Sequence, residues 1–141
     1  MAPRGMAAVS APGLRHVTLS TATFGRSLAF YDAALGALGL ARVQEFGDEE
    51  EDDAPLEAAG YGLPGQPPVF WLVAGAEVSR GAHVAFGTGS RAQVDAFFTS
   101  ATAAGGVATQ APRRWEIYRP GYYGALVADP DGNLVEAFVD E

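Results

Sequence analysis

The chain of 141 residues contains only two histidines, His16 and His83, and both begin or interrupt short apolar segments. A third residue of interest, Glu136, lies in the C-terminal run NLVEAFVD, four residues after Gly132 of the turn DPDG. A glutamate buried in a β-strand is costly unless a cation is paired with it. Two imidazoles and one carboxylate can hold a divalent ion and leave positions open for substrate. We therefore take His16, His83 and Glu136 as candidate metal ligands and leave the metal open among Zn, Ni, Fe, Mn and Co.

The two histidines occupy equivalent places in an internal repeat. A shift of 67 residues superposes His16 on His83 and Phe30 on Phe97 without a gap. The sequence therefore contains two copies of one supersecondary unit, whereas a solenoid would need three or more. Alternation of apolar and polar residues places Glu136 on the face opposite the core-directed valines of the final strand, as it does both histidines.

Each copy is predicted to consist of a strand, a helix and three further strands, which together give an α+β domain with largely antiparallel sheets. We expect Thr23 and Ser90 to cap the two helices, and Gly39 and Gly105–Gly106 to end them. The predicted strands are Leu14–Thr21, Ala41–Gly47, Leu56–Gly62 and Val69–Ala74 in the first copy, and Ala82–Thr88, Val107–Gln110, Tyr122–Ala128 and Asn133–Val139 in the second. The domain is expected to span residues 14–141, as module 1 (about 14–75) and module 2 (about 81–141), after a flexible segment 1–13.

Composition narrows the function classes. The chain has no cysteine, and all nine of its basic residues are arginines, which excludes thiolate metal sites and lysine-dependent chemistry. Its net charge of −8 disfavours nucleic acid and anionic membranes as partners. Six consecutive acidic residues, Asp48–Asp53, are expected at an exposed hairpin tip. These features favour a soluble, cytoplasmic domain whose partner is a small molecule.

Four segments carry a resemblance to the vicinal-oxygen-chelate superfamily: LRHVTL, SLAFYDAALGALGL, GAHVAF and DPDGNLVEAF. This superfamily includes glyoxalase I, extradiol dioxygenases, and fosfomycin and bleomycin resistance proteins. The resemblance extends from about residue 14 to the end. It implies cup-shaped sheets around a central cavity, a divalent metal on His16, His83 and Glu136, and a homodimer. Modules in this superfamily pair either within one chain or between two, and both arrangements stay open here.

Two departures leave the reaction open among isomerase, lyase and dioxygenase. Glyoxalase I has a fourth ligand at the end of its first module, and that place falls at Val69 or Trp71, neither of which can ligate. Extradiol dioxygenases have a tyrosine three residues before the aspartate of the turn, where this chain has Leu126.

Two function hypotheses follow. The first is a metal-dependent enzyme that chelates its substrate through two oxygens. The second is a metal-free, bleomycin-resistance-like protein that sequesters a small molecule, for which the negative charge would suit a cationic drug. Of the adjacent tyrosines 122 and 123, one is expected in the core and one in the cavity. The catalytic candidates are Glu136, Tyr122 and Tyr123, and the candidate substrate-binding residues are Trp71, Tyr118, Arg119 and Tyr123.

Overall fold

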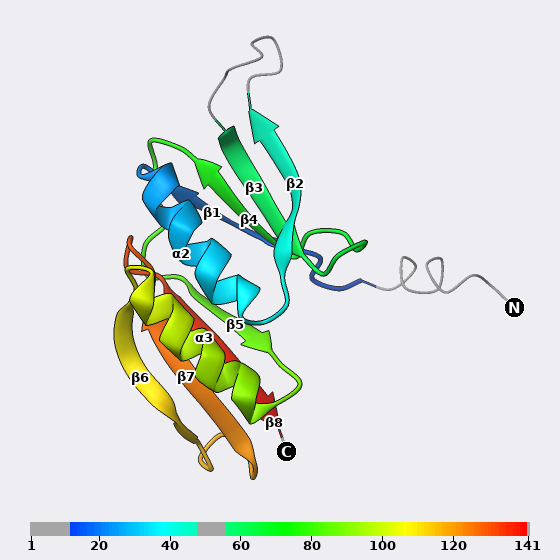
Figure 1. The fold of residues 1–141 in the computed structure, drawn as a ribbon, viewed down its shortest axis with the longest axis vertical. Coiled ribbons are helices and arrows are strands. Elements are labelled where there is room, and N and C mark those ends of the chain that lie inside the picture. Colours follow the sequence, from blue (N-terminus) through cyan, green and yellow to red (C-terminus); the bar gives the residue numbers. More distant parts are fainter. Residues whose placement is uncertain (1–11, 48–55, 141) are drawn as a thin grey trace, which may run out of the picture.

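The computed structural model describes residues 12–47 and 56–140. The predictions for the N-terminal segment and for the acidic run Asp48–Asp53 therefore fall almost entirely outside the described residues. The fold is α+β and repeats one βαβββ unit twice, as predicted (Figure 1). Its elements are β1 (Val17–Thr21), α2 (Phe24–Gly36), β2 (Ala41–Gly47), β3 (Leu56–Gly62), β4 (Phe70–Ala74), β5 (His83–Gly87), α3 (Arg91–Ala103), β6 (Val107–Arg114), β7 (Tyr122–Ala128) and β8 (Leu134–Asp140).

Each module forms its own four-stranded mixed sheet, with strand orders β1-β4-β3-β2 and β5-β8-β7-β6. The first strand of each module pairs in parallel with the last, and the other neighbours are antiparallel. The predicted bounds of β2, β3 and β7 agree with the structure, whereas β6 continues to Arg114, beyond the predicted end at Gln110.

The two helices begin differently. Ser90 caps α3 as predicted, because its hydroxyl accepts a hydrogen bond from the amide of Gln93 at 3.2 Å. The prediction for Thr23 is wrong, since its side chain makes no capping bond to α2. The hydroxyl of Thr21 organises this turn instead, accepting from the amide of Thr23 at 3.1 Å and bonding the Ser27 hydroxyl at 2.9 Å.

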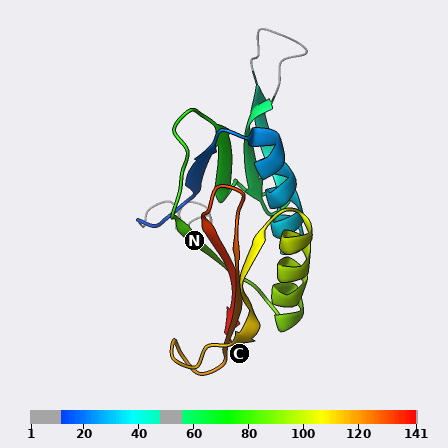
Figure 2. The ribbon, with the colours of Figure 1, turned by 90° about the vertical axis from the view of Figure 1, so that its left-hand side faces the viewer.

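Both helices lie on the same side of the two sheets (Figure 2). The core fills the space between these layers, and its largest fully buried apolar side chains are Phe30, Tyr31, Leu35, Tyr61, Phe70, Leu72, Val94, Phe97, Val127 and Val135. Among the described residues, no helix covers the opposite face of either sheet, which we call the open face. No helix in this part of the chain is long and apolar enough to cross a membrane.

Hydrogen bonds hold the two modules side by side. The hydroxyl of Tyr31, in α2, donates to Oδ2 of Asp129 in the β7–β8 turn at 2.5 Å, and both residues are buried. Burial and the neighbouring Asp129 carboxylate raise the pKa of Tyr31, so its hydroxyl remains a donor. Asn133 of the same turn donates to the carbonyl of Ser79, in the segment between the modules, at 2.9 Å. The helices α2 and α3 also pack against each other.

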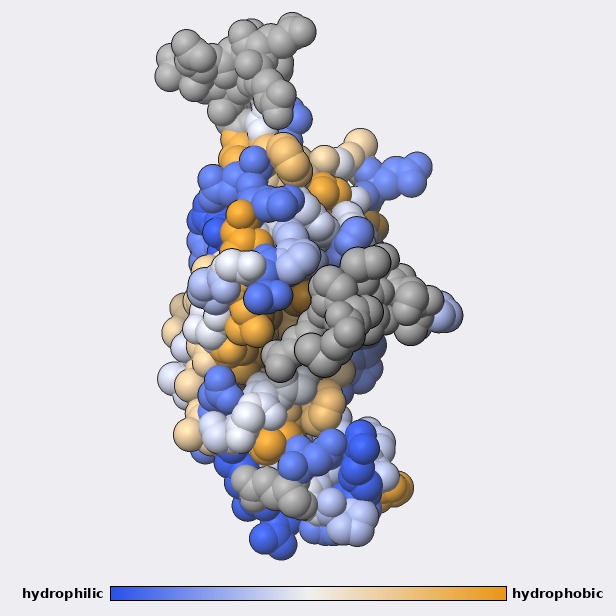
Figure 3. Space-filling model, turned by 90° about the vertical axis from the view of Figure 1, so that its right-hand side faces the viewer, coloured by the Kyte–Doolittle hydropathy of each residue, from blue (hydrophilic) through white to orange (hydrophobic). Residues whose placement is uncertain are grey.

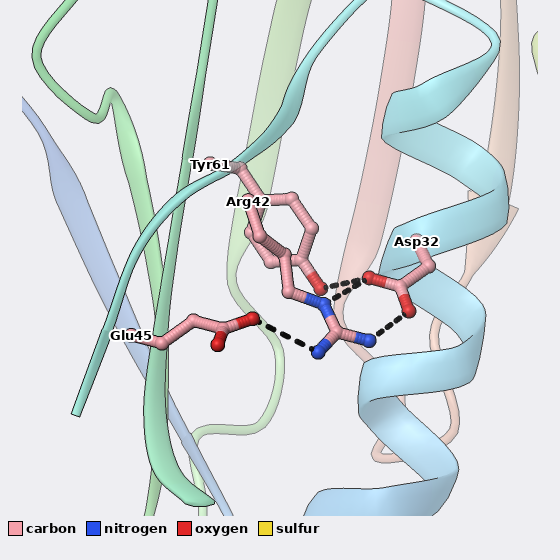
Figure 4. A network of polar contacts seen from close by, with 4 residues as sticks. All are labelled: Asp32, Arg42, Glu45 and Tyr61. Carbon is pink, nitrogen blue, oxygen red and sulfur yellow. Dashed lines mark hydrogen bonds and ion pairs between the residues drawn. The ribbon is translucent and has the colours of Figure 1, made fainter. Parts of the chain in front are cut away.

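A polar network on the surface fastens α2 to its own sheet (Figure 4). The guanidinium of Arg42 forks onto the carboxylate of Asp32, and its third nitrogen lies 3.2 Å from Glu45. Tyr61 donates to the same Asp32 carboxylate at 2.8 Å. Hydrogen bonding from Arg42 holds the pKa of Asp32 below its ordinary value. On the side of the molecule shown in Figure 3, apolar side chains form a broken column flanked by hydrophilic ones.

Candidate functional site

Two of the three predicted metal ligands meet on the open face of module 2. The parallel register of β5 and β8 pairs Ala85 with Glu136, and His83 is two residues before Ala85 on the same face. The Nε2 atom of His83 lies 2.8 Å from Oε1 of Glu136. Glu136 is buried, whereas the His83 side chain is half-exposed. An imidazole nitrogen and a carboxylate oxygen are thus held together at a point that a small molecule can reach.

Tyr122 holds the other oxygen of this carboxylate. Its hydroxyl donates to Oε2 of Glu136, and its ring stacks on Phe138 with centroids 4.9 Å apart and planes 8° apart. The ring lies along β7 over Gly124, where a Cβ atom would come within 3.4 Å of Tyr122 Cε1. Burial, followed by the hydrogen bond to Glu136, raises the pKa of Tyr122. The tyrosine therefore acts as a protonated donor that fixes the orientation of the carboxylate.

Tyr123 points to the other side of the sheet. Its hydroxyl donates to Asp95 of α3 at 2.7 Å, and the guanidinium of Arg91 lies 4.8 Å from its ring centroid. The hydrogen bond with Asp95 raises the pKa of Tyr123. Tyr123 thus packs under α3 and does not share a face with Glu136.

His16 lies apart from the His83–Glu136 pair. It is exposed, just before β1, and lines a cavity of about 370 Å³ to which His83 also contributes. Within the described ranges 12–47 and 56–140, no group of three His, Cys, Asp or Glu residues comes close enough to hold a metal ion. One chain therefore brings together two of the three predicted ligands, and His16 does not join them.

Trp71 occupies the place in module 1 that Glu136 has in module 2. The register pairs Trp71 with Thr18, two residues after His16, just as Glu136 pairs with Ala85. Of the two positions considered from sequence, the structure thus selects Trp71 over Val69 as the equivalent of the carboxylate. The open face of module 1 carries an indole where the other module carries a ligand.

Tyr118 and Arg119 lie in the β6–β7 connection, beside Tyr122. The ring of Tyr118 is 64% exposed and meets the Tyr122 ring edge-on, with centroids 5.2 Å apart. Arg119 lies 5.7 Å from the Tyr122 ring centroid, and its Nε atom is 3.2 Å from Asp140. Both residues thus border the Tyr122–Glu136 contact. Sequence reasoning missed Phe138, although its alternation with Glu136 on β8 was a usable signal.

The donor set at His83 and Glu136 fits a divalent ion in part. Both groups are ordinary ligands of Zn, Ni, Fe, Mn and Co, and a buried carboxylate beside an imidazole suits a cation. Stable binding needs at least one more protein ligand, because catalytic sites of this type use three. That ligand must come from another part of the assembly.

Comparison with known proteins agrees with this architecture. A family model described as Glyoxalase/Bleomycin resistance protein/Dioxygenase superfamily matches residues 13–137. A glyoxalase/bleomycin resistance protein from Albidiferax ferrireducens is 25% identical, with a TM-score of 0.70 over 89% of this chain and 97% of that chain. A glyoxalase-related enzyme from Fulvimarina pelagi is 20% identical (TM-score 0.66; 92% and 88%). A fosfomycin resistance protein from Listeria monocytogenes is 16% identical (TM-score 0.63; 93% and 95%). No curated protein matches the chain.

Proposed function

The chain belongs to the Glyoxalase/Bleomycin resistance protein/Dioxygenase superfamily, and we propose that it is a metal-dependent enzyme acting on a small, oxygen-bearing substrate. Members of this superfamily commonly use divalent metals and bind small molecules. The observation that carries the proposal is the buried Glu136 carboxylate, held between His83 and Tyr122 on the open face. A bound divalent ion would supply Lewis acidity to two neighbouring substrate oxygens, from which isomerase, lyase and dioxygenase reactions can all begin.

Each residue of the site has a distinct task in this proposal. His83 and Glu136 supply two of the ligands, and Tyr122 keeps the carboxylate oriented by donating to the oxygen that does not face His83. Tyr118 and Arg119 border the same place and would contact the substrate, with Arg119 able to fork onto an anionic group. The half-exposed edge of His83 leaves a path for the substrate to enter.

We propose that His16 completes the site from a second copy of the chain. The Tyr31–Asp129 and Ser79–Asn133 bonds hold the modules side by side, so module 1 does not fold over module 2 of its own chain. Both open faces are left for a partner. In a homodimer, module 1 of one copy would face module 2 of the other, bringing one subunit's His16 to the other's His83 and Glu136.

A mixed dimer tests this arrangement. His16→Ala and His83→Ala chains, carrying different tags, are co-expressed, and the heterodimer is purified without chelator for elemental analysis and metal titration. If sites form between chains, one site of the heterodimer keeps both histidines and the other has neither. We expect one ion per heterodimer at wild-type affinity and weak binding by either homodimer. If sites form within a chain, both are damaged and the heterodimer binds weakly.

The same measurements test the enzyme proposal against a metal-free, sequestering role. Two observations favour the latter: one chain groups only two donors, and an apolar cavity adjoins His16. Wild-type protein that acquires no divalent ion in titration, while light scattering reports a dimer of about 29 kDa from its 14.6-kDa chains, would exclude the metalloenzyme and leave this second function.

A further inference from the structure

A large apolar cavity begins beside His16, at the end of module 1. Its volume is about 830 Å³, within the range of roughly 300–1,000 Å³ of small-molecule sites. The lining residues that can make polar side-chain contacts are Arg15, His16, Gln44 and Gln66, together with the indole of Trp71. Leucine, proline, valine, phenylalanine and glycine make up the remainder of the wall. The lining therefore resembles a ligand site, with much apolar surface and a few polar groups.

The indole of Trp71 is held in place by its neighbours on the sheet. Its six-membered ring lies against Gly60 of β3, where a Cβ atom would come within 2.9 Å of Cη2 and Cζ2. A Cβ at Gly60 would also lie 3.0 Å from Pro68, so any larger residue would push the indole away. The ring of Phe46 stacks beside it, with centroids 5.6 Å apart and planes 15° apart. Trp71 and Phe46 thus form a rigid aromatic surface, which we call the Trp71 platform.

The charge of the cavity is informative as well. The chain carries a net charge of −8, yet none of the described residues that line this cavity is an aspartate or a glutamate. A cationic ligand would find no carboxylate among them, whereas a neutral or anionic ligand meets only Arg15, His16 and amide side chains. The local lining thus disfavours a cation, in contrast to the net charge of the whole chain.

We propose that the Trp71 platform is a stacking site for a planar, apolar substrate that carries no positive charge. A flat ring gains both apolar burial and face-to-face contact on a fixed indole, which a saturated ring of equal size cannot match. This inference deepens the proposed function and rests on it for one step: His16 lines the same cavity, so a stacked substrate would present its oxygens towards the metal. An aromatic compound with an oxygen-bearing edge is the class that fits.

Three matched probes test the proposal by isothermal titration on chelator-treated protein. The planar anion 2-naphthoate is compared with its saturated counterpart, decahydro-2-naphthoate, and with the planar cation 2-naphthylmethylamine. We expect 2-naphthoate to bind at least about tenfold more tightly than either. Equal affinity for the saturated acid would overturn the stacking site, and preferred binding of the amine would overturn its charge preference.

Variants locate the binding. Trp71→Ala should weaken 2-naphthoate binding about tenfold, and Trp71→Phe should retain most of it. Gly60→Ala keeps the indole but displaces it, so it should also weaken binding. The control is Trp115→Phe, at a residue outside the cavity lining, whose binding should stay within twofold of wild type. Wild-type affinity in both Trp71→Ala and Gly60→Ala would overturn the proposal. Because these titrations contain no metal, their outcome is separate from failure of the metal site.

Discussion

The contact between Tyr122 and Glu136 gives the sharpest test of the candidate metal site. In Tyr122→Phe the ring can still stack on Phe138, so the change removes only the hydroxyl that donates to Oε2 of Glu136. Glu136 is buried, and its Oε1 atom remains beside His83 at 2.8 Å. The carboxylate then keeps one anchored oxygen and loses the restraint on the other.

The magnitude follows from the role of such outer contacts. Loss of a hydrogen bond that orients a metal ligand typically lowers metal affinity by about 10- to 100-fold. A freed Oε2 atom has an opposing effect, because it could also bind the ion. We expect the orienting effect to dominate, since Oε2 is buried and unpaired after the change, at a cost of about 1–3 kcal/mol. The expected result is weaker binding of Zn²⁺ or Mn²⁺ by one to two orders of magnitude.

The assay is competition with a chromophoric chelator, together with the absorption spectrum of the Co²⁺-loaded protein. Tyr123→Phe is the matched control, because that hydroxyl bonds Asp95 on the other side of the sheet and should leave affinity within about twofold. Urea unfolding verifies that both variants are folded. Equal or tighter binding by Tyr122→Phe, with an unchanged Co²⁺ spectrum, would refute the orienting role. Absence of binding by wild type would instead refute the metal site.

Three further changes test other contacts. Glu136→Gln removes the anionic ligand and should weaken metal binding at least about tenfold while circular dichroism stays unchanged. Tyr31→Phe leaves the buried Asp129 one donor short and should lower the free energy of unfolding by about 1.5–3 kcal/mol in urea; a loss below 0.5 kcal/mol, on the order of a minor bond, would contradict the module tie. Asp32→Asn should cost about 0.5–1 kcal/mol at pH 7, because this side chain is 37% exposed and solvent screens its pairing with Arg42. The pKa of Asp32 is lower folded than unfolded, so this stabilisation is complete above about pH 4 and disappears as the pH falls further; a pH-independent difference would contradict that assignment.

Much of the fold was predictable because its signals are local. The alternation in each strand and the repeat of His16 at His83 predicted two βαβββ units, and the structure confirms them. The pairing of His83 with Glu136 follows from parallel register on one face. The place of Trp71 was ambiguous because the repeat is 67 residues at the histidines but 65 at the last strands, from Trp71 to Glu136.

Other features were beyond the sequence because they depend on distant partners. The bond from Tyr31 to Asp129 joins residues 98 positions apart, so no local pattern indicates it, and Asp129 was expected to do no more than shape a turn. The failure of Thr23 as a cap has a similar cause, since Thr21 competes for the same turn. Side-by-side placement of the modules likewise rests on a few side chains rather than on periodicity.

The tie between α2 and the β7–β8 turn also bears on the order in which the chain is made. Synthesis delivers module 1 first, when Tyr31 has neither Asp129 to receive its hydroxyl nor module 2 to cover it. Phe30 is in the same position, because its ring lies against the backbone at Gly106, close to where a Cβ atom would be. A nascent chain that ends before the turn therefore exposes a helix face whose partners are still inside the ribosome. Release of the last fifteen or so residues is the moment at which both halves become stable together.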